Sequence, residues 1–189
     1  MNKILVVCSS EKGRKVYTDN LKAMGYVHID IDTNGAAARR RLINDDYDIV
    51  IIDTPLKDEF GNDFAIKLSE GGNIGIVLVV RSVDADRISV KVEGYGVFVI
   101  PKPFTKSIFY QGIKFVETSI KRFSMLKQEK NQLLKQVEDI KKVDRAKCLL
   151  IQHNNMTEVQ AHRYLEKQAM DLRISRRAVA DKIINYFEV

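Results

Sequence analysis

A run of residues with almost nothing to interrupt a helix constrains this chain most. Residues 105–153 contain no proline and a single glycine, Gly112, and these two residue types are the strongest breakers of helices. Thr105 is a suitable N-cap, and Asn154 and Asn155 tolerate the left-handed conformation that ends helices. We therefore expect one long helix from Thr105 to His153, with folded segments before and after it.

The middle of this helix carries apolar residues at the spacing of a coiled coil. Steps of four and three residues alternate, with one additional step of three. Lys130 occupies a seam position, which weakens pairing without forbidding it. The alternative is a single amphipathic helix packed on its own domain, but so long a periodic run favours two paired chains, and we expect a homodimer. The seam consists of Val116, Ile120, Phe123, Leu126, Lys130, Leu133, Val137 and Ile140.

Charge is distributed unevenly along the chain. Its 189 residues suffice for one ordinary domain and a small second one. Residues 121–189 hold fifteen Lys and Arg against nine Asp and Glu, whereas the first 120 residues hold sixteen of each kind. A neutral first part joined to a basic second part favours a polyanionic partner, with nucleic acid as the leading candidate.

The amino-terminal segment, the hydropathy of the chain and its cysteines predict a cytoplasmic protein without membrane contact. The apolar run near the amino terminus is too short for a signal peptide, and neither half of the chain has a transmembrane run. Cys8 and Cys148 lie far apart and lack the spacing of metal ligands. We expect both to be reduced thiols.

The first hundred residues alternate between apolar runs of strand length and segments of helical character. Near-continuous apolar runs are typical of strands buried on both faces, and their alternation with helices predicts an α/β fold with a flavodoxin-like, doubly wound parallel sheet. The expected strands span residues 3–8, 27–31, 48–53, 74–80 and 97–100. The expected helices span residues 12–24, 34–44, 62–68 and 84–93.

Two motifs follow strands of this sheet, where function is expected. The segment DTPL at 53–56, with Gly61 beyond it, follows the third strand, and the triplet KPF at 102–104 follows the last one. At this separation the two motifs are specific, and residues 1–115 resemble the receiver domain of two-component response regulators. The resemblance implies that Asp53 stands at the phosphoacceptor position and that a histidine kinase or another regulatory protein is a partner.

The site departs from the receiver pattern in its metal ligands. In that family a lysine, here Lys102, contacts the phosphoryl group, and an acidic pair after the first strand holds the Mg²⁺ on which the transfer depends. Cys8 and Ser9 stand in place of that pair, and Val80 stands where a hydroxyl residue is usual. We therefore expect a pseudo-receiver that is not phosphorylated and needs no Mg²⁺ or other cofactor, with Asp53 and Lys102 as an ion pair.

A rebuilt metal site is the alternative for this domain. It would require Glu11, Asp30 or Asp32 to move beside Asp53 and supply the missing carboxylate, giving a phosphorylatable receiver with an unusual metal site. Because Mg²⁺ demands near-ideal octahedral geometry, we favour the receiver without metal.

Two shorter helices are expected after the long one. Thr157 and Gln160 form a capping-box pattern at the start of the first, and the second begins at Ser175. With the end of the long helix they make a unit at residues 143–189. That unit is small for independent stability, so we expect it to depend on the coiled coil at residues 116–142.

This unit resembles the ANTAR domain, an RNA-binding module of transcription antitermination regulators that often follows a receiver and a coiled coil. Cys148 stands where the family usually has glycine, and Glu166 where arginine is common, which removes a phosphate contact. The matching residues are Ala146, Lys147, Leu149, Leu150, Ala161, Tyr164, Leu165, Ala169, Met170, Asp171, Val179 and Ala180.

The resemblance implies capture of stem-loops in a nascent mRNA leader, which prevents a terminator from forming. Loops are recognised by stacking bases on aromatic or guanidinium planes, while Lys and Arg contact phosphates. Arg176 and Arg177 fall in the first turn of the last helix, where backbone N–H groups also attract phosphate, and Tyr164 is either a base-stacking or a half-buried core residue. The candidate RNA-binding residues are Arg145, Lys147, Arg163, Tyr164, Arg173, Arg176 and Arg177.

The sequence is compatible with other functions. A DNA-binding response regulator is one, although the last two helices lack a clear recognition helix. A small enzyme or cofactor-binding protein on the same sheet would need a glycine-rich phosphate loop, and the first loop has only Gly13. A dimerisation adaptor would have no affinity for RNA. We expect a regulator without enzymatic activity.

Overall fold

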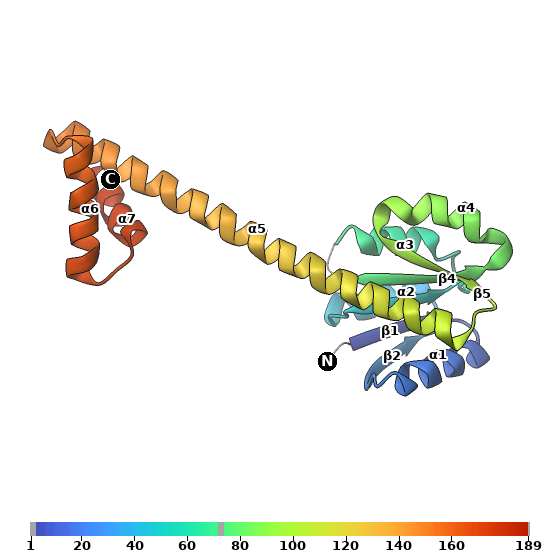
Figure 1. Ribbon diagram of the computed structural model, residues 1–189. Coiled ribbons are helices and arrows are strands. Elements are labelled where there is room, and N and C mark those ends of the chain that lie inside the picture. Colours follow the sequence, from blue (N-terminus) through green and yellow to red (C-terminus); the bar gives the residue numbers. More distant parts are fainter. Residues whose placement is uncertain (1–2, 72–73, 189) are drawn as a thin grey trace. The chain divides into compact units, whose positions relative to one another are not determined.

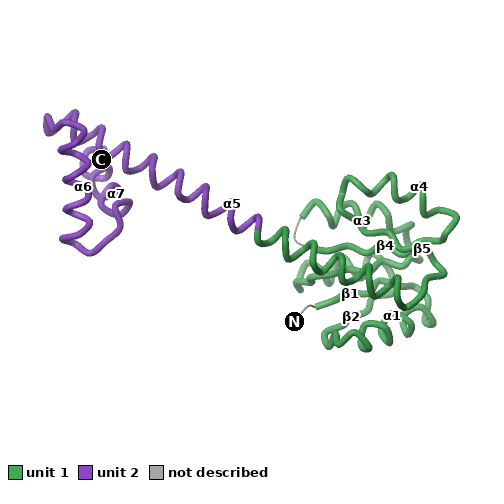
Figure 2. Tube along the Cα trace, viewed as in Figure 1, with its two compact units in different colours: residues 1–125 green, residues 126–189 purple. Residues whose placement is uncertain are grey.

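The computed structural model describes residues 3–71 and 74–188. The chain divides into two compact units, residues 1–125 and 126–189 (Figure 2). The expected outer limits of the first and last domains, residues 1 and 189, lie outside the described residues. Within the described ranges, no helix is both long and apolar enough to cross a membrane.

The first unit is a five-stranded parallel sheet with helices on both faces (Figure 1). The strand order β2-β1-β3-β4-β5 is that of a flavodoxin-like sheet, which confirms the expected fold class. The strands are β1 (Lys3–Cys8), β2 (His28–Asp32), β3 (Ile49–Asp53), β4 (Gly75–Arg81) and β5 (Val97–Lys102). The helices between them are α1 (Glu11–Ala23), α2 (Gly35–Asn44), α3 (Asn62–Ser69) and α4 (Ser82–Val92), and a 3-10 turn (Glu93–Tyr95) follows α4.

The sheet has a separate apolar core on each face because successive side chains of a strand point in opposite directions. On one face α2, α3 and α4 cover side chains such as Val7. On the other face α1 and the start of α5 (Lys106–Asn154) cover side chains such as Val6 and Ile51. Asp53, two residues after Ile51, therefore faces α1 and α5 at the carboxyl end of the sheet.

Helix α5 has 49 residues without interruption, which confirms the long helix. The Thr105 side chain accepts a hydrogen bond from the backbone N–H of Ile108 at 3.3 Å, so it caps the helix as expected. Asn155 follows the helix with a φ of 53°, in the left-handed region. Gly112 marks a close approach of α5 to the sheet, because a Cβ there would lie 2.7 Å from the ring of Phe98.

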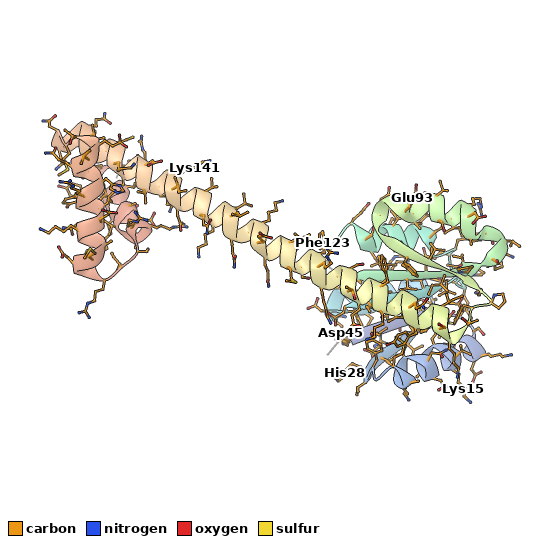
Figure 3. All side chains as sticks on the ribbon, in the orientation of Figure 1. Lys15, His28, Asp45, Glu93, Phe123 and Lys141 are labelled. Atoms are coloured by element: carbon orange, nitrogen blue, oxygen red, sulfur yellow. The ribbon has the colours of Figure 1, made fainter. Side chains whose placement is uncertain are left out.

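The apolar seam of α5 changes its surroundings along the helix. Val116 and Ile120 pack against the core of the first unit. Beyond them, the apolar seam residues from Phe123 (labelled in Figure 3) to Ile140 are between 49% and 62% exposed. An exposed apolar stripe of this kind, interrupted only at Lys130 among the seam positions, is the surface that a second copy would cover in a coiled coil.

The second unit is a three-helix arrangement. Helices α6 (Glu158–Leu172) and α7 (Arg176–Phe187) pack with the end of α5 around a small apolar core. Thr157 and Gln160 form the expected capping box, with both hydrogen bonds present. Ser175 caps α7 by accepting a hydrogen bond from the N–H of Ala178 at 3.2 Å. The buried members of this core are Ala146, Leu150, Ala161, Leu165, Val179 and Ala180.

Candidate functional sites

Asp53 and Lys102 meet at the carboxyl edge of the sheet. Asp53 is the last residue of β3 and is only 8% exposed. Lys102 Nζ donates to Asp53 Oδ1 at 2.5 Å and to the carbonyl oxygen of Thr54 at 2.7 Å. The structure thus contains the ion pair expected from the sequence.

The Cys8 thiol forms a hydrogen bond with the other carboxylate oxygen of Asp53. Cys8 pairs with Asp53 in the register of β1 and β3, and its Sγ donates to Asp53 Oδ2 at 3.1 Å. Burial, followed by the neighbouring carboxylate, raises the pKa of the Cys8 thiol to about 12. The thiol is therefore protonated at neutral pH and acts as a hydrogen-bond donor to Asp53.

Helix α1 packs closely against Cys8 and Asp53. A Cβ at Gly13 would lie 2.7 Å from Cys8 Sγ and 3.2 Å from Asp53 Oδ2. Tyr17 is buried and its ring stacks on that of Phe104, 5.9 Å between centroids. Burial, the main cause, and the charge of Asp53 raise the pKa of Tyr17. Asp53 is thus held in a closely packed environment.

The three carboxylates that could rebuild a metal site beside Asp53 are either bound to other side chains or exposed. Asp32 receives two hydrogen bonds from Arg41, at 2.8 and 3.0 Å. Asp30 accepts one from the Tyr47 hydroxyl at 2.6 Å, while Glu11 lies in the exposed first turn of α1. Within residues 3–71 and 74–188, no group of three or more His, Cys, Asp or Glu side chains has a metal-binding arrangement.

The loop after Asp53 is attached to α2 through a residue that the sequence analysis did not single out. Asp58 accepts hydrogen bonds from the N–H groups of Gly35 at 3.0 Å and Ala36 at 2.9 Å. These contacts, that of Gly35 first, lower the pKa of Asp58. The carboxylate therefore satisfies free donors at the start of α2, where the helix dipole also favours a negative charge.

Three of the candidate RNA-binding cations are engaged within the second unit. Arg145 Nε donates to Glu188 Oε1 at 2.6 Å. Lys147 pairs with Asp144 at 2.8 Å. Arg177 lies in the first turn of α7, as expected, but its guanidinium turns back to pair with Asp139 of α5. These cations are partly neutralised before any ligand approaches.

The other four candidate RNA-binding residues have weaker ionic contacts or none among the described residues. Arg176 makes a long contact of 3.5 Å with Glu166. Neither Arg163 nor Arg173 forms an ion pair with any described residue. Tyr164 is 38% exposed. The seven candidates therefore fall into paired and available residues. Arg173, Arg176 and Arg177 do not form one patch of unpaired charge, because Arg177 is bound to Asp139.

Comparison with solved structures identifies the fold of the first unit. A signal receiver domain of a histidine kinase from Syntrophus aciditrophicus aligns with a TM-score of 0.57 at 23% identity, covering 65% of this chain and 94% of that one. The chemotaxis response regulator CheY4 of Vibrio cholerae aligns with a TM-score of 0.55 at 19% identity, covering 61% of this chain and 98% of that one. The first unit has the receiver fold.

Comparison with protein families identifies the second unit. Residues 131–184 match the ANTAR domain, so the chain joins a receiver-like fold to a C-terminal ANTAR domain. The transcriptional regulatory protein PdtaR of Mycobacterium tuberculosis is 26% identical over 137 residues, which cover 72% of this chain and 67% of PdtaR. The chain is homologous to this transcriptional regulatory protein.

Proposed function

We propose that this protein is a cytoplasmic, RNA-binding regulator of transcription antitermination. The observation that carries the proposal is the ANTAR match over residues 131–184, in a three-helix unit that lies within the basic part of the chain. A basic surface suits a phosphate backbone. Capture of stem-loops in an mRNA leader by this unit would keep a terminator from forming.

The second part of the proposal is that Asp53 is not phosphorylated. A receiver needs a cation with several oxygen ligands near the phosphoacceptor, whereas Asp53 is bound by Lys102 and the Cys8 thiol. The fold then has no enzymatic role and no need for Mg²⁺ or another cofactor. Its regulatory input is contact with another protein, of which a histidine kinase is one candidate.

The third part is that the protein acts as a homodimer paired along α5. The exposed apolar seam supports this arrangement, and pairing would present two ANTAR domains to one transcript. Two linked binding modules gain affinity because the second contact is intramolecular.

Nucleic-acid selectivity tests the proposed function directly. The purified chain is mixed with a pool of RNAs that carry two short stems with randomised loops, and bound RNA is enriched and compared with duplex DNA of equal length over a range of salt. We expect enriched RNAs to bind far more tightly than the DNA at moderate salt. Equal and steeply salt-dependent binding to both would reduce the unit to a non-specific basic surface, and preference for duplex DNA would support the DNA-binding alternative.

A further inference from the structure

The basic side chains of the second unit fall into two groups. One group is neutralised internally, by the ion pairs of Arg145, Lys147 and Arg177 and by that of Lys142 with Asp181 at 2.6 Å. The other group makes no ion pair with described residues, and three of its members, Arg163, Lys167 and Lys182, border one groove.

This groove, which we call the Tyr164 groove, consists of two adjoining hollows that share Asn154 and Tyr164. The first, of about 480 Å³, lies between the end of α5 and α6, and Arg163 and Lys167 border it. The second, of about 300 Å³, lies where α5, α6 and α7 meet, and Lys182 borders it. Both hollows belong to the ANTAR unit.

The sequence of α6 places the groove side chains on one helical face. Gln160, Arg163, Tyr164, Lys167 and Gln168 follow the spacing of three and four residues that aligns side chains along a helix. The neighbouring face of α6, with Ala161, Leu165 and Ala169, supplies core residues of the unit. The groove is thus a regular feature of the helix and not an accident of one loop.

The charge and chemistry of the groove select its ligand. None of the described residues that line either hollow is Asp or Glu, whereas three are Lys or Arg. The lining of the second hollow includes the buried apolar residues Leu150 and Val179, and amide side chains line both hollows. Apolar lining suits a base plane, amides suit base edges, and cations suit phosphates.

Aromatic rings stand at the positions where bases could stack. Tyr164 is 38% exposed and Tyr186 is 79% exposed. The Tyr186 ring meets Phe187 edge to face, 4.9 Å between centroids, and Phe187 stacks on His153 at 4.7 Å. Exposed aromatic rings are typical platforms for unpaired bases.

We infer that the Tyr164 groove binds unpaired nucleobases of an RNA loop. Tyr164 and Tyr186 provide the stacking surfaces, and Arg163, Lys167 and Lys182 contact the phosphates on either side. This inference rests on the proposed function and refines it, because it places the base contacts in a groove formed by α5, α6 and α7 and assigns roles to Lys167, Lys182 and Tyr186.

The test uses the full chain and an enriched loop RNA from the pool described above. Tyr164→Ala and Tyr186→Ala are each expected to weaken binding by about 5- to 150-fold, the usual range for losing one stacked base. Tyr164→Phe keeps the ring and should bind nearly as well as the parent chain. Tyr110→Ala removes a tyrosine of the first unit whose exposure, 49%, lies between those of Tyr164 and Tyr186, and it serves as the control.

A second readout separates stacking from general loss of affinity. With 2-aminopurine in the RNA loop, the parent chain should change the fluorescence of the base, and Tyr164→Ala at saturating concentration should not. Arg163→Ala with Lys182→Ala should lower the dependence of binding on salt, whereas Lys141→Ala, outside the groove on α5 (labelled in Figure 3), should lower it less.

The outcomes distinguish the inference from the function on which it rests. If the parent chain enriches no RNA, the proposed function fails. If it binds RNA tightly but the Tyr164 and Tyr186 variants, shown by circular dichroism to keep their helices, bind equally well, the groove assignment is overturned and the RNA-binding function stands.

Discussion

Both carboxylate oxygens of Asp53 already have partners, one in Lys102 and one in Cys8. We therefore predict that the chain gains no phosphate when it is incubated with acetyl phosphate and Mg²⁺, as measured by intact mass. The double variant Cys8→Asp with Ser9→Asp restores two carboxylates and should bind Mg²⁺ more tightly than the parent chain in calorimetry. A mass gain in the parent chain that disappears in Asp53→Asn would contradict the pseudo-receiver assignment.

Asp58 provides a pH-dependent contribution to the stability of the first unit. Its pKa is lowered by hydrogen bonds from the start of α2, so the stabilisation is present above the pKa of an unfolded aspartate, about 4, and is lost as pH falls below it. We predict that Asp58→Ala lowers the free energy of unfolding by about 1 kcal/mol at pH 7, a modest value because the residue is exposed.

Urea unfolding at several pH values measures this effect. The difference between Asp58→Ala and the parent chain should shrink as pH falls below about 4. Asp46→Ala is the control, because Asp46 is exposed and has no hydrogen bond or ion pair with a described residue. A difference that is the same at pH 7 and at acidic pH would show that the charge of Asp58 is not the cause.

Lys130 is the charged residue in the exposed seam of α5, and it makes the weakest contribution to pairing. We predict that Lys130→Leu strengthens the dimer at least about tenfold, because each chain would bury an apolar side chain in place of a charged one. Sedimentation equilibrium measures the change. Lys135→Leu, between Leu133 and Val137 and off the seam, should leave the dimer almost unaltered, and equal effects of the two variants would count against pairing along this seam.

The helices and strands could be located from the sequence because their apolar patterns are strong, but their ends could not. The last strand was expected to stop at Ile100, where the apolar run ends, whereas β5 continues to Lys102. The reason lies in the backbone, since Pro101 and Lys102 remain in register with Val80 and Arg81 of β4. Strand pairing extends beyond the residues whose side chains reveal it.

At the level of the whole molecule, the fold is easier to predict from the sequence than which basic side chains are free to bind a ligand. The sequence identified Asp53 and Lys102 as neighbours because strand ends meet at one edge of a parallel sheet. It could not show that Arg145 is paired, because Glu188 lies 43 residues away and reaches it only through packing of the three helices. Arg177 and Asp139, 38 residues apart, are a second case.

The three-helix unit also gave Tyr186 and Lys182 surroundings that the sequence did not reveal. Tyr186 reads as one more aromatic residue near the end of a short helix, and only the packing of α7 beside α6 places it along the same groove as Tyr164. The i, i+4 spacing of Lys182 and Tyr186 was the available signal.

The measurement that tests the account most directly compares one RNA with two loops against the same RNA with one loop closed into a plain stem. A dimer with two ANTAR domains should bind the two-loop RNA about 100-fold or more tightly than the one-loop RNA, and calorimetry should find two chains per RNA. Equal affinity for both RNAs, or one chain per RNA, would contradict paired capture of stem-loops.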